Sequence, residues 1–203
     1  MTEIIVLLML LTGFGVYTLR SKIQKKRIAL LGDHLGQYQI EKQMENLTLG
    51  YLRALGEADA ERQTQIWTLL DSSEQDLCEQ FDRFVAGFAR VEEDDARVST
   101  LPIFVPEAQR IFPGHTFDMR QALAVHAVGI RRVAKNDEAL LPKNKAFTLS
   151  AELFLMQHTC HWYCRSKTVA SGRMLVRHKT TYAKLLASVS PGTRQAYGAL
   201  VGP

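Results

Sequence analysis

The densest group of chemically reactive side chains in this sequence lies at residues 158–164, which read His-Thr-Cys-His-Trp-Tyr-Cys. On a helix, residues three or four positions apart share a face, so Cys160, His161 and Cys164 can lie together. Thiolate and imidazole groups are ligands for zinc and for other borderline metals. The sequence therefore suggests a metal or haem site with the candidate ligands His158, Cys160, His161 and Cys164.

A simpler interpretation of the same segment is structural. Its spacing matches neither Cys-x-x-Cys nor Cys-x-x-Cys-His, and a complete metal site needs a further ligand, such as His126 or His178. The cysteines then are small buried residues of a helix packed on both sides, with the histidines hydrogen-bonded at its edge. A catalytic Cys-His pair is disfavoured, because no orienting acid and no oxyanion donor accompany it.

Searches for other catalytic signatures are negative. The chain has no Gly-rich phosphate loop, no His-Glu-x-x-His, no Gly-x-Ser-x-Gly and no Asp-rich calcium loop. The sequence therefore predicts a protein that is not an enzyme and that carries no cofactor outside the His/Cys group.

Cations gather in the C-terminal third. Residues 153–203 hold seven basic and no acidic residues, whereas residues 53–100 hold twelve acidic and five basic residues, a net charge of −7. Arg173, Arg177 and Lys184 follow each other at helical spacing and cluster on one side. The candidate residues for binding an anionic partner are Arg165, Lys167, Arg173, Arg177, Lys179 and Lys184.

Three partners would suit these cations: an acidic protein, anionic lipid or nucleic acid. Nucleic acid is not favoured, because no base-reading module such as a helix-turn-helix is visible. An interpretation without a binding function is also open, in which the cations form a solvated surface or face the acidic segment.

The element that positions the whole chain is its N-terminus. Residues 4–19 carry no charge and are followed by five cations within eight residues, here called the cationic collar. An apolar run with such a flank is typical of a membrane anchor held at its cytoplasmic edge. The residues that define it are Ile4, Leu8, Leu11, Phe14 and Leu19, and the collar comprises Arg20, Lys22, Lys25, Lys26 and Arg27.

The uncharged run has 16 residues and is slightly shorter than the roughly 20 that span a bilayer core. The long stems of Arg20 and Lys22 can compensate by reaching the interface. A cleaved signal peptide and a buried core helix are the alternatives. A signal peptide carries its cations before the apolar run, whereas here Glu3 precedes the run and the cations follow it, which disfavours that alternative. The positive-inside rule places the N-terminus outside and the remainder in the cytoplasm of an inner (plasma) membrane.

We expect residues 1–27 to form the anchor and residues 28–203 to form one all-α domain, a bundle of about six or seven helices. The helices are expected at residues 33–55, 60–70, 72–91, 116–135, 148–170, 172–189 and 192–200. Between them, a Pro-rich connector covers residues 98–114, where any short strand has no visible partner. The anchor helix is expected to break at Gly32 and Asp33, and Phe81, Phe84 and Phe88 form a stripe at helical spacing that predicts a core face. The expected caps are Ser72 or Ser73, Thr116 or Asp118, and Ser190 followed by Pro191. The odd count of three cysteines suits a reducing compartment.

These features together predict a single-pass, non-enzymatic protein that docks other proteins in a bacterial inner-membrane assembly, such as a secretion or conjugation apparatus. It would act as a subunit of a complex or as an oligomer. The first alternative is a membrane-tethered metal- or haem-binding sensor that uses the His/Cys group. The second is a protein that binds nucleic acid or anionic lipid through the basic C-terminal third.

Overall fold

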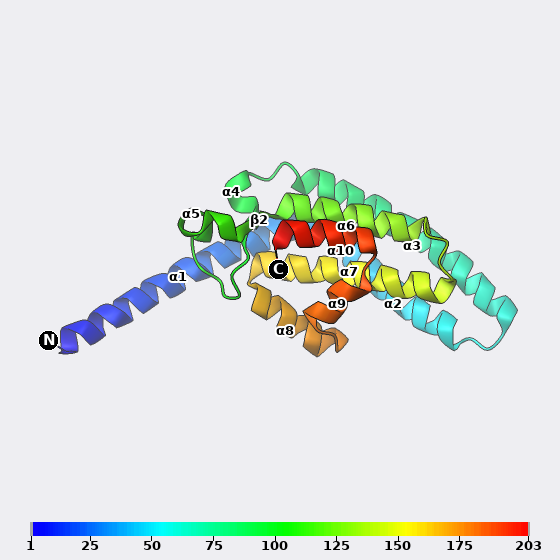
Figure 1. The fold of residues 1–203 in the computed structure, drawn as a ribbon, viewed down its shortest axis with the longest axis horizontal. Coiled ribbons are helices and arrows are strands. Elements are labelled where there is room, and N and C mark those ends of the chain that lie inside the picture. The colour runs from blue at the N-terminus through cyan, green and yellow to red at the C-terminus, as the bar shows by residue number, and fades with distance from the viewer. Residues whose placement is uncertain (1, 203) are drawn as a thin grey trace.

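The computed structural model describes residues 2–202, and these are mainly helical (Figure 1). Helix α1 covers Thr2–Leu35 without interruption, so the predicted break at residues 32–33 is wrong. The helix ends only where the amide of Gly36 donates to the carbonyl of Gly32 at 2.8 Å. Leu31 is buried against the bundle, and this packing holds the last turns of α1 in place.

Helices α2 (Ile40–Gly56) and α3 (Ala60–Phe88) form an antiparallel hairpin. The second helix therefore begins later than the predicted residue 33. Asp59 caps α3 by accepting from the amides of Glu61 and Arg62 at 2.9 and 3.1 Å.

Helix α3 is one element, whereas the sequence predicted two. Ser72 and Ser73 were expected to cap a new helix, but their hydroxyls donate instead to the carbonyl of Leu69, at 2.8 and 3.3 Å. Serine can bond back to a preceding turn in this way without ending the helix.

The phenylalanine stripe of α3 forms part of the core, as its spacing predicted. Phe81, Phe84 and Phe88 are fully buried, and successive ring centroids are 5.7 and 5.9 Å apart. The ring of Phe88 also meets that of Tyr163 edge-on at 5.8 Å. Aromatic pairs at such distances add to the stabilisation from apolar burial.

The segment between α3 and α6, which includes the connector, contains short elements: α4 (Glu93–Ala96), β1 (Arg97–Ser99), α5 (Ala108–Ile111), the 3-10 helix η1 (Pro113–His115) and β2 (Thr116–Asp118). β1 pairs antiparallel with β2, with Val98 opposite Phe117. The partner strand missing from the sequence prediction is thus the segment just after the prolines. Both central side chains are buried, which fixes the register.

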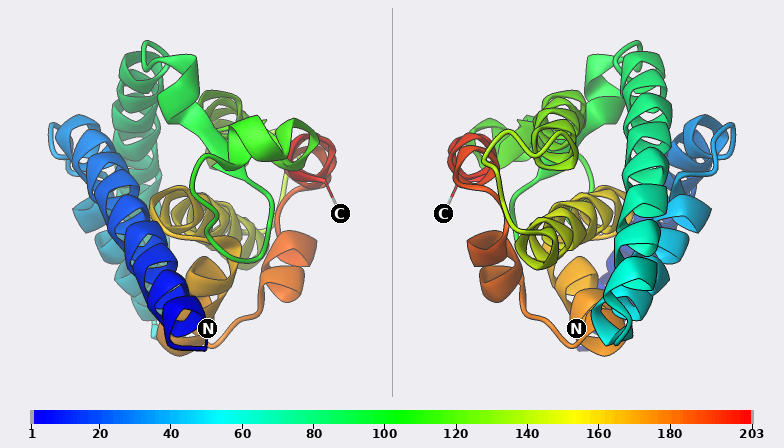
Figure 2. Two further views of the ribbon diagram at one scale, coloured as in Figure 1. Left: turned by 90° about the vertical axis from the view of Figure 1, so that its left-hand side faces the viewer. Right: turned by 90° about the vertical axis from the view of Figure 1, so that its right-hand side faces the viewer.

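Helix α6 (Met119–Ala134) begins at Asp118, whose carboxylate accepts from the amide of Arg120 at 2.8 Å, in agreement with the predicted cap. Helix α7 (Pro142–Cys164) starts and ends earlier than predicted. It stops because Ser166 caps a new helix, accepting from the amide of Val169 at 3.3 Å. α7 runs through the middle of the bundle (Figure 2) and is buried on nearly every side.

Three shorter helices complete the chain: α8 (Lys167–His178), α9 (Tyr182–Ser188) and α10 (Pro191–Val201). The predicted start of the last helix at Ser190 and Pro191 is confirmed, with Ser190 as its cap. Apart from one-turn α4 and α5, seven α-helices follow α1 in residues 2–202, and this confirms the predicted all-α bundle.

Candidate functional site

The most distinctive part of the molecule is the junction at which α1 leaves the bundle. Residues 3–20 of α1 are exposed and project away from the bundle (Figure 1). Burial begins just after them, at Gln24, whose side-chain oxygen accepts from Nη1 of Arg165 at 2.6 Å. The bundle therefore packs against α1 directly after the apolar run.

Arg27 is the centre of this junction. Its guanidinium donates to the backbone carbonyls of Arg97 and Tyr163, at 2.5 and 3.3 Å. The same group lies 5.2 Å from the centre of the Tyr163 ring and 5.7 Å from that of Phe104. One side chain thus ties α1 to β1, to α7 and to the connector through charge-assisted hydrogen bonds and cation–π contacts.

The collar therefore has two parts. Lys26 forms an ion pair with Asp95 at 2.5 Å, and together with Arg27 it attaches α1 to the bundle. Arg20, Lys22 and Lys25 are exposed and form no ion pair with any residue in the described range 2–202. Of the five collar cations, these three have no ion-pair partner among residues 2–202 and remain available to an external anionic surface.

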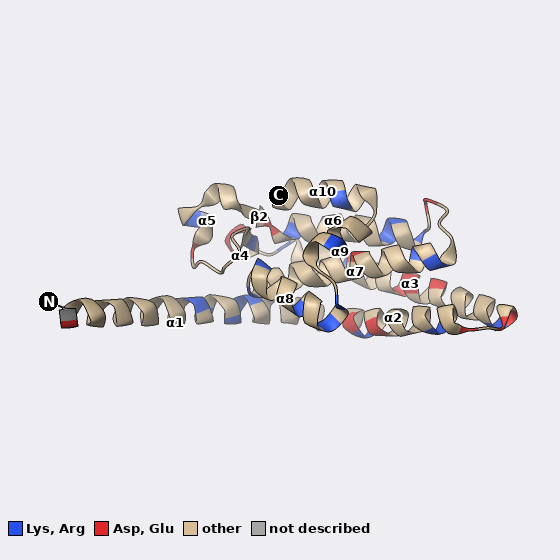
Figure 3. Cartoon of the chain, turned by 60° about the horizontal axis from the view of Figure 1, so that its bottom comes forward, with Lys and Arg blue, Asp and Glu red and all other residues tan. Residues whose placement is uncertain are grey.

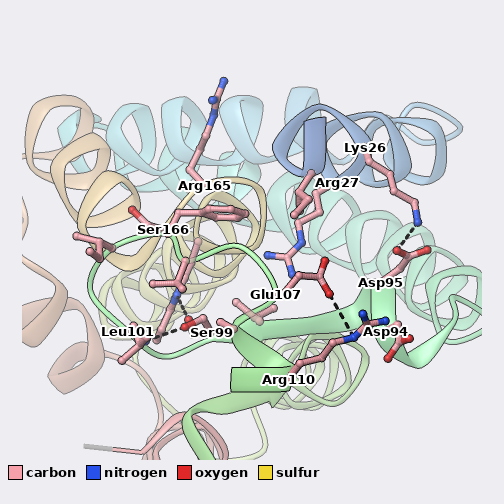
Figure 4. A pocket seen from close by; sticks show the side chains of 17 residues that line it. Lys26, Arg27, Asp94, Asp95, Ser99, Leu101, Glu107, Arg110, Arg165 and Ser166 are labelled. Atoms are coloured by element: carbon pink, nitrogen blue, oxygen red, sulfur yellow. Dashed lines mark hydrogen bonds and ion pairs between the residues drawn. The ribbon is translucent and has the colours of Figure 1, made fainter. Parts of the chain in front are cut away.

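A cavity of about 180 Å³ lies inside the junction (Figure 4). Its wall contains two ion pairs, Lys26 with Asp95 and Arg110 with Glu107, the latter at 3.3 Å. Arg27, Arg165 and Asp94 also line the cavity, so its wall mixes four cations with three carboxylates and is not of one sign. The arrangement fits a structural join better than a catalytic site.

An apolar groove of about 310 Å³ lies beside the junction, between α1, α2 and α7. Three of the predicted metal ligands, Cys160, His161 and Cys164, line this groove. His158 lies elsewhere, because its Nε2 is 3.1 Å from Oγ of Ser171 and its ring stacks on Tyr182 at 4.7 Å. The structure thus brings together three of the four predicted residues.

The protonation states of this group are those of a packed interior. Burial raises the pKa of Cys164 to about 11 and raises that of Cys160 further. Burial and the charges of Arg173 and Arg177 lower the pKa of His161 to about 4. Within residues 2–202, no three His, Cys, Asp or Glu side chains are grouped so that they could hold a metal ion. A metal or haem site at these residues stays a prediction.

The predicted anion-binding residues fall into two sets. Arg165 bonds to Gln24, and the ammonium of Lys167 lies 5.1 Å from the ring centres of both Trp162 and Tyr182, so these two cations have partners inside the molecule. The other four are exposed on α8, at its C-terminal cap and on α9, and Arg173 among them donates to Nδ1 of His161 at 3.1 Å. These four are here called the basic face: Arg173, Arg177, Lys179 and Lys184.

The basic face has no ion-pair partner within the described chain, residues 2–202. Three carboxylates of α3 pair instead with other helices: Asp82 with Arg131, and Asp71 and Glu74 with Lys145. Figure 3 shows the cations of α8 next to α1 and the carboxylates of α3 in a different part of the bundle. The acidic and basic segments therefore do not neutralise each other through direct ion pairs among these residues.

Sequence reasoning missed two buried polar groups. Glu74 accepts from the hydroxyl of Tyr51 at 2.7 Å, and Nζ of Lys145 lies 2.6 Å from its carboxylate. Glu152 accepts from both the amide and the hydroxyl of Ser190 at 3.0 and 2.7 Å. A signal for Glu74 was present, because it occupies a position on the apolar stripe of α3 that otherwise carries leucine and phenylalanine.

Comparison of the chain with protein-family models gives no match, and comparisons with curated proteins and with solved structures give none either. The site must therefore be interpreted from its own chemistry.

Proposed function

We propose that this protein is a single-pass protein of a bacterial inner membrane, anchored by α1, with its N-terminus outside and its bundle in the cytoplasm. An 18-residue window of α1 has a mean hydropathy of 1.8, and none of that window is buried in the bundle. The exposed collar cations Arg20, Lys22 and Lys25 follow it, which supports the cytoplasmic orientation of the bundle.

The anchored bundle docks partner proteins and has no catalytic role of its own. Support comes from the basic face, whose four cations are exposed and lack ion pairs within residues 2–202. A surface of one sign favours association with a complementary charged partner. The partner is an acidic protein of the same membrane assembly, of the secretion or conjugation type.

One observation carries this proposal. α1 is a single helix from Thr2 to Leu35, and the bundle binds its second half at Gln24, Arg27 and Leu31. A bundle attached in this way keeps a fixed orientation relative to its anchor. That is a useful property for a docking subunit, because a rigid anchor reduces the orientational freedom lost on assembly.

Cross-linking and co-purification of the full chain from its native membrane tests the proposal. We would compare the wild-type protein with the triple variant Arg177→Glu, Lys179→Glu, Lys184→Glu. The matched control is Arg53→Glu, Arg62→Glu, Lys143→Glu, which reverses the same number of exposed cations on other helices.

The expected result is loss of the partner protein in the basic-face variant and its retention in the control. Equal recovery of the partner from both variants would contradict docking at the basic face. Loss of the bound material on nuclease treatment would instead identify the partner as nucleic acid and would contradict a protein partner.

A further inference from the structure

The connector exposes large apolar side chains at the end of the bundle from which α1 emerges. Ile103 is 65% exposed, Ile111 is 58% exposed and Phe112 is 43% exposed. Several exposed large apolar side chains within one short segment are typical of a surface that another apolar phase covers. These three residues are here called the apolar tip.

The apolar tip lies close to the collar. Phe104 belongs to the same connector and makes cation–π contacts with α1. The guanidinium groups of Arg20 and Arg27 lie 5.9 and 5.7 Å from the centre of its ring. In Figures 1 and 3, α5 is the part of the bundle that reaches furthest along α1 toward its N-terminus. The apolar tip therefore lies close to where the uncharged run of α1 ends.

The connector is held in this position from the bundle side. The hydroxyl and the amide of Thr168 donate to the carbonyl of Pro102 at 2.6 and 3.2 Å, and the indole of Trp162 donates to the carbonyl of Ser99 at 2.9 Å. The β1–β2 pair fixes the other end. These contacts hold the connector against the bundle, while the side chains of the apolar tip remain exposed.

Charge around the apolar tip fits an anionic surface. Arg110, adjacent to Ile111, has a side chain that is 74% exposed, and the exposed collar cations Arg20 and Lys22 belong to the neighbouring α1. Glu107 pairs with Arg110 at 3.3 Å, so these two charges offset each other, and the cations that favour an anionic surface are Arg20 and Lys22. Apolar groups that enter the acyl boundary, with cations at headgroup level, are the usual composition of an interfacial contact.

We propose that the apolar tip is a second membrane contact, in which Ile103, Ile111 and Phe112 enter the interface of the leaflet next to the collar, while Arg20 and Lys22 meet anionic phospholipid headgroups. The inference rests on the proposed function, because it needs α1 to lie in the bilayer. A single helix would leave the bundle free to tilt relative to the membrane plane. With the second contact, the bundle presents its basic face in one direction relative to the membrane.

Photo-crosslinking of the full chain tests this contact. A benzophenone amino acid would replace Ile111 in protein reconstituted into nanodiscs of phosphatidylethanolamine and phosphatidylglycerol, and adducts would be identified by mass spectrometry. Leu11, in the uncharged run, reports on the anchor itself. Leu141, which is 72% exposed at the start of α7, is the matched exposed leucine at the opposite end of the bundle.

We expect phospholipid adducts at positions 11 and 111 and none at position 141. Adducts at position 11 without any at position 111 would overturn the second contact and leave the anchor intact. A cross-link from position 111 to another protein chain would likewise overturn it, because the apolar tip would then be a protein interface. Absence of lipid adducts at position 11 would refute the proposed anchor, and the second contact with it.

Discussion

The guanidinium of Arg27 lies 5.2 Å from the centre of the Tyr163 ring and donates to the backbone carbonyl of the same tyrosine at 3.3 Å. This relationship joins α1 to the most buried helix of the bundle. Because α1 is continuous from Thr2 to Leu35, the joint also fixes the direction in which the apolar run leaves the bundle.

Removal of the Arg27 side chain should loosen the joint. In Arg27→Ala the carbonyls of Arg97 and Tyr163 lose a charged donor, and two aromatic rings lose their cation. We expect the free energy of unfolding to fall by about 2–3 kcal/mol, the cost of losing charge-assisted hydrogen bonds. Urea unfolding in detergent micelles measures this change. The control Lys25→Ala removes an exposed collar cation, and an equal loss in both variants would contradict the account.

Lys145 should be needed to keep Glu74 in the interior. Burial raises the pKa of Glu74, and Lys145 and Tyr51 act in the opposite direction. Lys145→Met would leave a buried carboxylate without its cation, at an expected cost of about 3 kcal/mol at pH 7. The loss should be smaller at pH 5, because protonation of Glu74 then becomes easier.

The double variant Glu74→Gln, Lys145→Met serves as the control for this pair and should recover most of the lost stability, since no buried charge is left unpaired and Asp71, which also loses Lys145, is 63% exposed. A double variant as unstable as Lys145→Met alone would show that the lysine acts through packing. Unfolding in urea at both pH values measures each variant.

Stability should also depend on pH through His126. Its side chain is fully buried, and burial, followed by the charge of His158, lowers its pKa to about 3. Between that value and the ordinary value of 6.5, the unfolded chain binds a proton that the folded chain does not, so stability falls as pH falls. From pH 7 to pH 5 this residue should cost about 2 kcal/mol.

The variant His126→Gln isolates this contribution, because glutamine retains a polar group near Oγ1 of Thr159, which lies 2.9 Å from the imidazole. The difference in unfolding free energy between wild type and variant should change by about 2 kcal/mol between the two pH values. Parallel pH profiles for the two proteins would contradict the assigned pKa.

The three cysteines should react slowly in the folded protein. Burial raises the pKa of Cys78 and of Cys164 to about 11 and that of Cys160 further, so very little thiolate is present at pH 7. We expect alkylation by a maleimide at pH 7 to be about a hundred-fold slower in the native protein than in urea. Rapid labelling of native Cys160 would contradict its burial.

The same assay examines the predicted metal site with an internal control. If Cys160 and Cys164 bind zinc, added zinc should slow their alkylation further and leave Cys78 unaffected, because Cys78 does not line the groove. An equal effect of zinc on all three cysteines, or no effect, would count against metal binding.

The sequence supplied the local features of this fold well. The caps at Asp118 and Ser190 and the phenylalanine stripe of α3 follow from patterns within a few residues. The helix and strand predictions were wrong where contacts between segments far apart in the sequence determine the structure. Ser72 reads locally as a cap, yet α3 continues because α2 packs along it, and β1 pairs with a strand that lies beyond the prolines.

The arrangement of the His/Cys group could be predicted in part, whereas its role as a metal site stays a prediction. Spacing placed Cys160, His161 and Cys164 on one face correctly, and all three line the groove. It did not separate His158 from them, because that separation depends on α8 and α9 covering the opposite side of α7, where Ser171 and Tyr182 bind the imidazole. The role of Arg27 was hidden for the same reason, since its partners lie far along the chain.

The central claim is that α1 crosses the inner membrane and leaves the bundle in the cytoplasm. Labelling with a membrane-impermeant maleimide in intact spheroplasts tests it, with Glu3→Cys and Leu141→Cys as reporters and the protein without added cysteine as the blank. The account predicts labelling at position 3 in intact cells and at position 141 only after the membrane is permeabilised. Labelling at position 141 in intact cells, or recovery of the protein in the soluble fraction, would contradict it.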